Sequence, residues 1–309
     1  MPLADGSSTV TCAVTTYRQS EYLAEAIQSC LDQNYPLLEV LVIDNGEDDP
    51  TAEICRSFGS AIRVIRQENC GPSGARNRAL REAGGMYVAF LDGDDRMDSN
   101  AVSARMQIAL GAGENFGLLV GAYRVVDRVG EVQYEDALAD AGRHETSFWQ
   151  AVEEMRCPTV CMIVERQASL EIGGFDESLR IAEDSDFLIR MARVRRCLID
   201  PVPRADYRQV PGSISRDYML WFDSYHRMLR KNRALAPGGF RNSWKFLLAF
   251  ARLCRLQLFS KLMKDKTVQR PVAKILSLMA KRPLLIPFAF YYAGTFLFRK
   301  LAPDRAHER

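Results

Sequence analysis

Short β-branched runs alternate with longer stretches of helical periodicity along the first hundred residues of the chain. The predicted strands cover residues 9–17, 38–44, 61–67 and 84–92. The stretches between them place apolar side chains at helical spacing, as Leu23, Ile27 and Leu31 do. Because each connection is long enough for a helical crossover, the pattern predicts parallel strands in an α/β fold.

The pattern is less regular beyond residue 98, where a polar stretch ends near residue 145. We predict further strands at 116–127, 158–165 and 207–216, and helices at 98–111, 147–155, 166–174 and 183–195. Carboxylates fill the first turn of the last of these helices, where they interact favourably with the helix dipole. Their presence is therefore explained without any chemical role.

Polar side chains gather where the predicted strands end. Thr15 and Tyr17 close the first strand, Asp44 and Asn45 close the second, and the segment AFLDGDDRMD (89–98) ends the fourth. In an open parallel sheet, ligands bind just beyond the carboxyl ends of the strands. The three clusters therefore predict one binding site at this edge of the sheet.

The segment AFLDGDDRMD places Asp92, Asp94 and Asp95 within four positions. Like charges this close raise one another's pKa unless a cation lies among them. A turn with a helix N-cap is the ordinary structural explanation, because Asp favours both, and a bound divalent cation is the functional one. The chain has only three histidines, which favours a cation held by oxygen, Mg²⁺ or Mn²⁺.

The bulk composition is that of a globular protein with a buried core. The chain has 309 residues, of which 47% are hydrophobic and 26% charged. Its first residues carry neither a basic start nor a long apolar stretch, so we expect a reducing cytosol. Cys157 and Cys161 suggest zinc, but no second pair of ligands with suitable spacing follows them, and zinc is disfavoured.

The net charge of +2 conceals a sharp division of the chain. Residues 1–220 carry 22 Arg, no Lys and 35 Asp plus Glu, a net charge of −13. Residues 221–309 carry 19 Lys plus Arg against 4 Asp plus Glu, a net charge of +15. We therefore expect two parts in different surroundings. Nucleic-acid binding is disfavoured, since the predicted site lies in the acidic part.

The basic part carries an amphipathic pattern that is typical of membrane surfaces. Residues 244–264 mix large apolar side chains with Lys and Arg, and residues 283–298 form an uncharged run of 16. A helix that spans a bilayer needs about 20 apolar residues, so an interfacial location is favoured. We expect a peripheral protein on the cytoplasmic face of an anionic membrane. The alternative is a helical subdomain whose basic face packs on the acidic domain.

Six ordered motifs over residues 9–216 resemble the family 2 inverting glycosyltransferases of the GT-A fold. They read VTTYRQSEYLAEAI, LVIDNGEDD, GPSGARNRAL, FLDGDD, GGFDESL and AEDSDFLIRMA. The chain departs from the family pattern at Thr15 and Arg18, where Pro and Asn are usual, and at Asn45 and Glu47. Any one motif is weak evidence, whereas six in the right order are strong.

The resemblance implies a GT-A fold, a Rossmann-like mixed sheet with helices on both faces. It does not cover the residues beyond 220, whose charge and apolar pattern predict a basic helical C-terminal extension. It implies a metal-dependent, inverting, hexosyltransferase-type enzyme that uses Mn²⁺ or Mg²⁺. The donor would be a nucleoside diphosphate sugar, with a UDP-sugar favoured. The acceptor would be a glycan or a lipid-linked hydroxyl in cell-surface polysaccharide or glycolipid synthesis. Residues 1–220 would form the catalytic domain and residues 221–309 the extension.

On the donor side, the resemblance assigns nucleotide-sugar binding to Thr15, Tyr17, Asp44, Asn45, Arg76, Asp92 and Arg216. Asp44 would accept a hydrogen bond from the uracil imide, beside Asn45, while Thr15 and Tyr17 wall the base. Arg76 would lie against the base or against nearby carboxylates. The ordinary explanations are a turn-forming Asp and a helix-surface Arg.

On the catalytic side, the resemblance assigns Asp94 to the metal and Asp92 to the metal or the donor ribose, while Asp95 would support the loop. Asp184 would be the general base of the inverting transfer, and Glu183 is the second choice. Arg216, in the segment PGSISR (211–216), would close over the diphosphate as a cationic clamp.

Three other functions compete with this interpretation. An aspartate-phosphoryl hydrolase would carry its nucleophile after the first strand, which here ends in Thr15–Tyr17. A sugar-nucleotide-forming enzyme would need a Gly-rich loop there, and TTYRQSEY contains no Gly. A non-catalytic nucleotide-sugar-binding module is disfavoured because both Asp94 and Asp184 are present.

Overall fold

The protein was analysed as a computed structural model that describes residues 8–36, 38–46, 50–113, 115–135, 144–154, 158–210 and 218–237. Arg216 and the extension beyond residue 237, including the segments 244–264 and 283–298, lie outside these ranges. Within them, no helix is both long and apolar enough to cross a bilayer.

Strands and helices alternate over residues 10–92, as the periodicity predicts. The helices are α1 (Ser20–Leu31), α2 (Thr51–Ser57), α3 (Gly71–Glu82), α4 (Ala101–Gly111), α5 (Phe148–Glu154), α6 (Arg166–Glu171), α7 (Glu183–Met191) and α8 (Tyr218–Asn232). The strands are β1 (Val10–Thr16), β2 (Leu38–Asp44), β3 (Arg63–Arg66), β4 (Tyr87–Asp92), β5 (Arg96–Met97), β6 (Phe116–Gly121), β7 (Arg124–Val126), β8 (Val132–Glu135), β9 (His144–Thr146), β10 (Met162–Glu165), β11 (Arg196–Asp200) and β12 (Ala205–Arg208).

A mixed sheet of eight strands in the order β3-β2-β1-β4-β10-β6-β11-β9 forms the centre of the protein. Strands β1 to β4 pair in parallel, which confirms the prediction from their crossovers. Strand β10 runs antiparallel to both β4 and β6, so the sheet is mixed. A smaller sheet, β5-β12-β7-β8, lies beside the carboxyl end of β4, because β5 follows β4 after a short turn.

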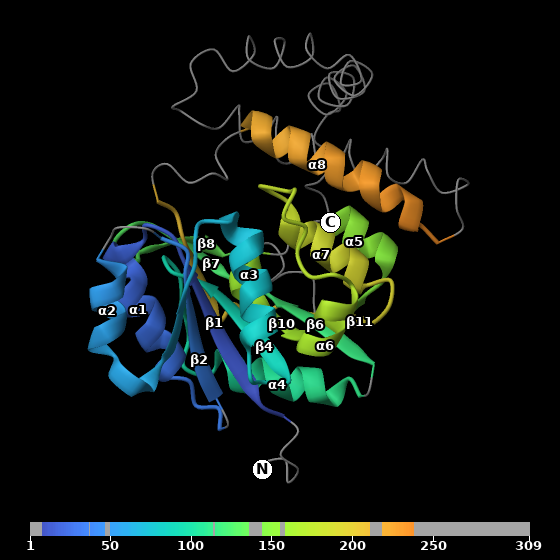
Figure 1. Ribbon diagram of the computed structural model, residues 1–309. Coiled ribbons are helices and arrows are strands. Elements are labelled where there is room, and N and C mark those ends of the chain that lie inside the picture. Colours follow the sequence, from blue (N-terminus) through green and yellow to red (C-terminus); the bar gives the residue numbers. More distant parts are fainter. Residues whose placement is uncertain are drawn as a thin grey trace, which may run out of the picture.

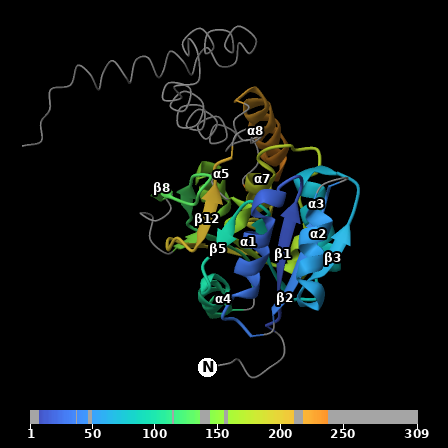
Figure 2. The same ribbon diagram turned by 90° about the vertical axis from the view of Figure 1, so that its left-hand side faces the viewer.

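Alternation of side chains along each strand fills two apolar layers. In β1, Val10, Cys12 and Val14 face the layer covered by α1, α2 and α4, whereas Ala13 faces the other. Helices α3, α5, α6 and α7 cover that second layer, so helices lie on both faces of the sheet (Figures 1 and 2). This arrangement confirms the predicted fold class.

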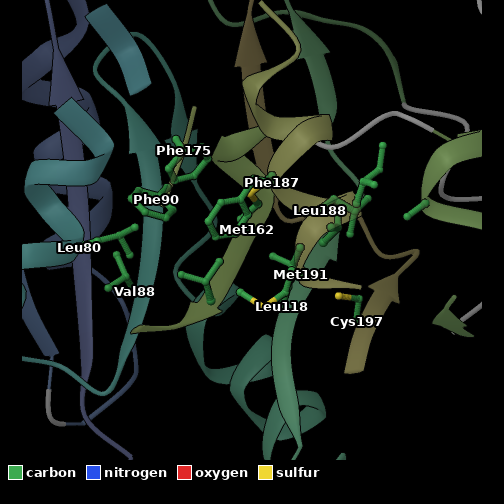
Figure 3. Packing of buried hydrophobic residues seen from close by; sticks show 14 of the residues in the cluster. Leu80, Val88, Phe90, Leu118, Met162, Phe175, Phe187, Leu188, Met191 and Cys197 are labelled. Carbon is green, nitrogen blue, oxygen red and sulfur yellow. The ribbon is translucent and has the colours of Figure 1, made fainter. Parts of the chain in front are cut away.

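Aromatic packing in the second layer fixes α7 against the sheet (Figure 3). The ring of Phe175 stacks on that of Phe187 with centroids 4.3 Å apart and meets Phe90 of β4 edge-on at 5.4 Å. Phe187 lies one turn after the start of α7, so this contact determines where the first turn of that helix lies. The three rings are almost completely buried.

Helix α8 crosses the boundary that the sequence predicts at residue 220. Its side chains Tyr225, Met228 and Leu229 are buried in the same apolar layer as α7. Figure 1 shows α8 beside α7, on the side of the molecule toward which the carboxyl ends of the parallel strands point. The first helix of the basic part therefore packs as an element of the core.

Several elements differ from the sequence prediction. The strand predicted at 116–127 is divided into β6 and β7, and the helix predicted at 183–195 ends at Met191. Strand β11 was missed although its residues RCLID alternate, because the predicted helix extended almost to its start. Strands β5, β8 and β9 have two to four residues each, which is too short for a periodic pattern to identify them.

Candidate functional site

The parallel strands bring three of the predicted polar positions to one edge of the sheet. In the register of the sheet, Thr15 lies opposite Asp92 and Thr16 lies opposite Asp44. The Thr15 hydroxyl donates a hydrogen bond of 3.0 Å to Asp92 Oδ1. The expectation that these clusters share one edge is therefore confirmed by the pairing of the strands.

Arg76 joins two carboxylates that are distant in sequence. Its Nη2 donates to Asp92 Oδ1 at 2.9 Å and to Oδ2 at 3.1 Å, and its Nη1 donates to Glu183 Oε1 at 2.7 Å. Burial opposes the charge of the guanidinium, but Asp92 and Glu183 together hold its pKa above the usual value. The side chain is 4% exposed, which excludes the surface-arginine explanation and makes Arg76 the link between β4 and α7.

The local structure at the start of α3 places Arg76 between Asp92 and Glu183. The helix begins at Gly71, whose φ of 76° lies in the left-handed region, and Pro72 follows in the first turn. The next side chain, Asn77, donates to the carbonyl of Phe175 at 2.9 Å and accepts from its amide at 2.7 Å. A side chain at Gly174 would collide with Asn77, since a Cβ there would lie 2.3 Å from its Oδ1. The segments ARN (75–77) and GGFDES (173–178) therefore pack against each other.

The loop after β4 carries the other two carboxylates of the acidic segment. Asp95 is fully buried and accepts from the amide of Arg208 at 2.7 Å, while the guanidinium Nε of Arg208 donates to the carbonyl of Asp94 at 2.9 Å. Burial and the charge of Asp92 raise the pKa of Asp94 to about 6, against a hydrogen bond from Gln19. Burial and the neighbouring Asp94 and Asp92 hold the pKa of Asp95 well above its usual range. The loop thus concentrates negative charge that its protein neighbours only partly compensate.

The residues of this loop fit a divalent cation shared with a ligand. Among the described residues, no three His, Cys, Asp or Glu side chains converge as a metal site would require. Mg²⁺ and Mn²⁺ nevertheless need only one or two carboxylates where phosphate oxygens and water complete the shell. Asp94 offers such a carboxylate, whereas both oxygens of Asp92 already accept from Arg76. Asp94 is therefore the better ligand, with Asp92 in support.

The first turn of α7 presents Asp184 next to Glu183. Burial, together with the charge of Glu183, raises the pKa of Asp184 to about 7, although the Ser185 amide donates to its Oδ1 at 2.6 Å. Ala182, just before the helix, has a φ of 69°, a strained conformation for a residue other than Gly. A carboxyl group with a pKa near neutrality can both take and release a proton there.

The side chains at the ends of β1 and β2 differ in exposure and in the hydrogen bonds that they already make within the protein. Asp44 is 3% exposed and accepts from the Gly46 amide at 3.0 Å. Asn45 is engaged by the loop before α3, because its Oδ1 accepts from Gln67 at 2.9 Å and its Nδ2 donates to Asn69 at 3.0 Å. Tyr17 is 39% exposed at the end of β1. Asn45 therefore organises the loop, while Tyr17 can contact a ligand.

Side-chain contacts link four of the predicted residues, Thr15, Asp92, Arg76 and Glu183, and Asp184 follows Glu183 in the chain. Arg216 lies outside the described residues.

The sequence prediction missed two residues that shape the acidic loop. Arg208, which is 4% exposed, fixes the backbone of Asp94, and its Nη2 also donates to Glu25 at 2.7 Å. The side chain of Gln19 lowers the pKa of Asp94. Both come from segments remote in sequence from the loop, and neither has a local motif. The alternation of β12 gave no signal either, since it groups Arg208 with Asp206 on the polar face of the strand.

We expect Arg76→Met to lower the free energy of unfolding by about 3–5 kcal/mol, because it leaves two carboxylates without their shared buried partner. Arg78→Met on the same helix is the matched control. Its ion pair with Glu82 is largely exposed, and such pairs contribute about 0.3–0.5 kcal/mol. Urea denaturation measures both variants. Equal losses of unfolding free energy in the two variants would show that the buried ion pairs of Arg76 do not stabilise the site.

Comparison with known proteins places this geometry in a family. Residues 11–170, about half of the chain, match the family model described as glycosyl transferase family 2. An uncharacterized glycosyltransferase of Rickettsia bellii is 26% identical over 196 residues, 62% of this chain and 28% of its own length. Glycosyltransferase GlyA of Streptococcus pneumoniae is 36% identical over 96 residues, 30% of this chain. The match spans only 14% of GlyA.

Solved structures share the fold at low sequence identity. The 1–349 fragment of S. aureus TarS in complex with UDP-GlcNAc superposes with a TM-score of 0.68 at 17% identity, covering 84% of this chain and 76% of that one. The mannosyltransferase PcManGT from Pyrobaculum calidifontis, in complex with GDP-Man and Mn²⁺, has a TM-score of 0.58 at 19% identity. That likeness covers 91% of this chain and 82% of PcManGT. At these identities the likeness establishes the fold.

Proposed function

Because the chain belongs to glycosyl transferase family 2, we propose that its site transfers a sugar from a nucleoside diphosphate to an acceptor hydroxyl, with inversion at the anomeric carbon. The observation that carries this proposal is the bridge made by Arg76. It ties Asp92, at the end of a sheet strand, to Glu183, which precedes Asp184 on α7. A group that binds the donor and a group that can take a proton are thereby held in fixed relation, as a direct displacement requires.

On the donor side, we assign recognition of the nucleotide to the ends of β1 and β2. Asp44 presents a buried carboxylate that suits the imide N–H of a uracil, and Tyr17 supplies an exposed ring for the base. Thr15 holds Asp92 in place at the same edge. The UDP-GlcNAc complex of TarS, a structural neighbour, supports a UDP-sugar as the donor.

At the diphosphate, we assign Asp94 to a Mn²⁺ or Mg²⁺ ion, with Asp92 in support. Such an ion neutralises the charge that develops on a diphosphate leaving group. Burial and the charge of Asp92 raise the pKa of Asp94, and a cation bound there would favour the ionised carboxylate. The Mn²⁺ complex of PcManGT is consistent with this choice of cation. Arg216 is proposed as a second cationic group, a clamp over the diphosphate.

On the acceptor side, Asp184 is the proposed general base. Its pKa of about 7 makes the carboxylate a competent proton acceptor at neutral pH, where an ordinary Asp would be too weak a base. Glu183 is less suited because its carboxylate already accepts from Arg76 at 2.7 Å. The proton of the acceptor hydroxyl passes to Asp184 as the oxygen attacks the anomeric carbon from the face opposite the diphosphate.

The proposed acceptor is a glycan or a lipid-linked hydroxyl, and a hexose is the proposed sugar. The decisive experiment offers the purified full-length chain a panel of nucleotide sugars with Mn²⁺ and follows hydrolysis of each donor. Consumption of one class of donor supports the proposal. Donor binding without consumption, with or without candidate acceptors, would identify a non-catalytic module and overturn it.

We also propose that the basic extension places the protein on the cytoplasmic face of a membrane. Full-length protein should sediment with anionic vesicles and less so at high salt, because each Lys or Arg near an anionic surface contributes about 1 kcal/mol. Zwitterionic vesicles are the control for lipid itself. A chain that ends at residue 237 keeps the buried residues of α8 and should stay in the supernatant. Full-length protein that ignores anionic vesicles at low salt would refute the membrane proposal.

A further inference from the structure

Helix α8, which lies beyond the residues matched by the family model, contacts the first turn of α7 through polar side chains. The Tyr225 hydroxyl lies 3.3 Å from Ser185 Oγ, and Ser185 Oγ donates to Asp184 Oδ1 at 3.2 Å. Ser185 is completely buried and Tyr225 is 7% exposed. A chain of hydroxyl groups therefore runs from α8 to the carboxylate that we assign as the base.

The direction of this chain follows from the number of protons. A serine hydroxyl has one proton to donate. The carboxylate oxygens of ionised Asp184 can only accept a hydrogen bond. When Ser185 gives its proton to Asp184, the contact between the two hydroxyls takes the proton of Tyr225. Tyr225 then donates to Ser185, and Ser185 becomes a stronger donor to the carboxylate.

Two further contacts hold α8 in register with α7. The fully buried carboxylate of Asp186 accepts from Asn232 Nδ2 at 2.7 Å and from Lys231 Nζ at 3.2 Å. Lys231 also pairs with Asp176 of the GGFDES loop at 2.5 Å. Because Asp186 is buried and Lys231 is ion-paired, these contacts hold α8 in place. The Tyr225 hydroxyl is therefore fixed relative to α7.

The structure assigns Tyr225 as a positioning residue of the site, which orients and stabilises the Asp184 carboxylate through the hydroxyl of Ser185. This inference rests on the proposed role of Asp184 as the base. It makes most of α8 part of the active site, although the sequence predicts that the catalytic domain ends at residue 220.

The other charged groups around Asp184 act independently of this chain. Glu183 on the same helix raises the pKa of Asp184, and Arg76 from α3 lowers it. On the α8 side, Lys231 is turned to Asp186 and Asp176. Burial is the largest cause of the raised pKa, and the hydrogen bonds from Ser185 together with the charge of Arg76 keep it from rising further.

The test is a carbon-13 NMR titration of the full-length chain labelled at the aspartate carboxyl groups. The Asp184 resonance is identified by its loss in Asp184→Asn. In Tyr225→Phe the titration midpoint should rise by roughly half to one pH unit, as expected for a weakened hydrogen bond to the ionised form. Tyr35→Phe is the matched control. Tyr35 lies just before the amino end of β2, and its hydroxyl donates to the carbonyl of Ser8.

Ser185→Ala distinguishes a relay from a general effect of packing. It should also raise the midpoint, and adding Tyr225→Phe to it should change nothing further, because the link between the two groups is already broken. An unchanged midpoint in Tyr225→Phe would overturn the inference. An equal rise in both backgrounds would overturn it as well, since Tyr225 would then act without Ser185.

The result of the titration does not depend on whether the proposed function is correct. If the wild-type chain consumes no nucleotide sugar, the proposed function fails, while the midpoints still decide whether Tyr225 acts on Asp184. If the chain is active, the acid limb of kcat/KM should move in Tyr225→Phe by the same amount as the midpoint. The donor KM should stay constant, because the Tyr225 hydroxyl acts through Ser185 on Asp184, the proposed base.

Discussion

Replacing Asp184 with Asn is expected to lower kcat by about 10²–10⁴-fold while donor binding is retained, because a missing general base affects the chemical step and hardly the ground state. The change is nearly isosteric, and the amide keeps an oxygen that can accept from the Ser185 amide. The carboxylate that takes the acceptor proton is lost. Donor affinity, measured by calorimetry, should therefore match the wild type.

The neighbouring variant Glu183→Gln separates the two carboxylates of the motif. If Glu183→Gln abolishes transfer and Asp184→Asn does not, the base is Glu183. If Asp184→Asn raises only the donor KM, Asp184 is a binding residue and the base lies elsewhere. Both variants leave the backbone of α7 unchanged, so far-UV circular dichroism should show no difference between them.

The pH dependence of the wild type follows from the same residue. The pKa of Asp184 is about 7, and only the ionised form can accept a proton, so kcat/KM should fall as the pH drops through this value. The raised pKa also bears on stability. An Asp whose pKa is higher in the folded than in the unfolded state loses stabilisation as the pH rises through the folded pKa. Asp184→Asn should thus raise Tm above neutral pH, where the wild type keeps a buried charge.

Asp94→Asn is expected to abolish metal-dependent turnover with the fold intact. The variant removes the charge of the best-placed carboxylate of the acidic loop and keeps its shape. The hydrogen bond that Arg208 donates goes to the backbone carbonyl of Asp94, which the substitution leaves in place. Because metal binding requires the ionised carboxylate, the metal response of the wild type should weaken as the pH falls through about 6.

The measurement is the affinity for UDP with and without Mn²⁺, beside the turnover of the donor. Wild-type protein should bind UDP more tightly when Mn²⁺ is present, and Asp94→Asn should show no such gain. Asp32→Asn is the matched control, because it removes an exposed carboxylate just after α1, remote from the carboxyl ends of the strands. Unchanged activity of Asp94→Asn at saturating Mn²⁺ would contradict the assignment of Asp94 as the metal ligand.

The strands of the central sheet and the edge that carries the site were predictable from the sequence. Residues such as Val10 to Thr16 are β-branched and apolar because both faces of this parallel sheet are covered, so the run itself identifies the strand. Helical crossovers then require parallel pairing, and parallel pairing brings the ends of β1, β2 and β4 together. Thr15, Asp44 and Asp92 were found for this reason.

Partners that come from remote segments were not predictable. The sequence shows Arg76 on a helix but cannot show that it is buried between Asp92 and Glu183, which lie 16 and 107 positions away. Its burial depends on the packing of α3 and α7 on one face of the sheet, which local periodicity does not encode. The function of Arg208 in the acidic loop depends in the same way on the pairing of β12 with β5.

The sequence by itself determined the order of the elements, the edge of the sheet where the site lies and the types of residue found there, because these follow from periodicity and strand pairing. Only the tertiary structure decided which carboxylates are paired, which have raised pKa values and that α8 packs into the core. Desolvation and ion pairing depend on every group within a few ångströms, and such neighbours are assembled only when the chain folds.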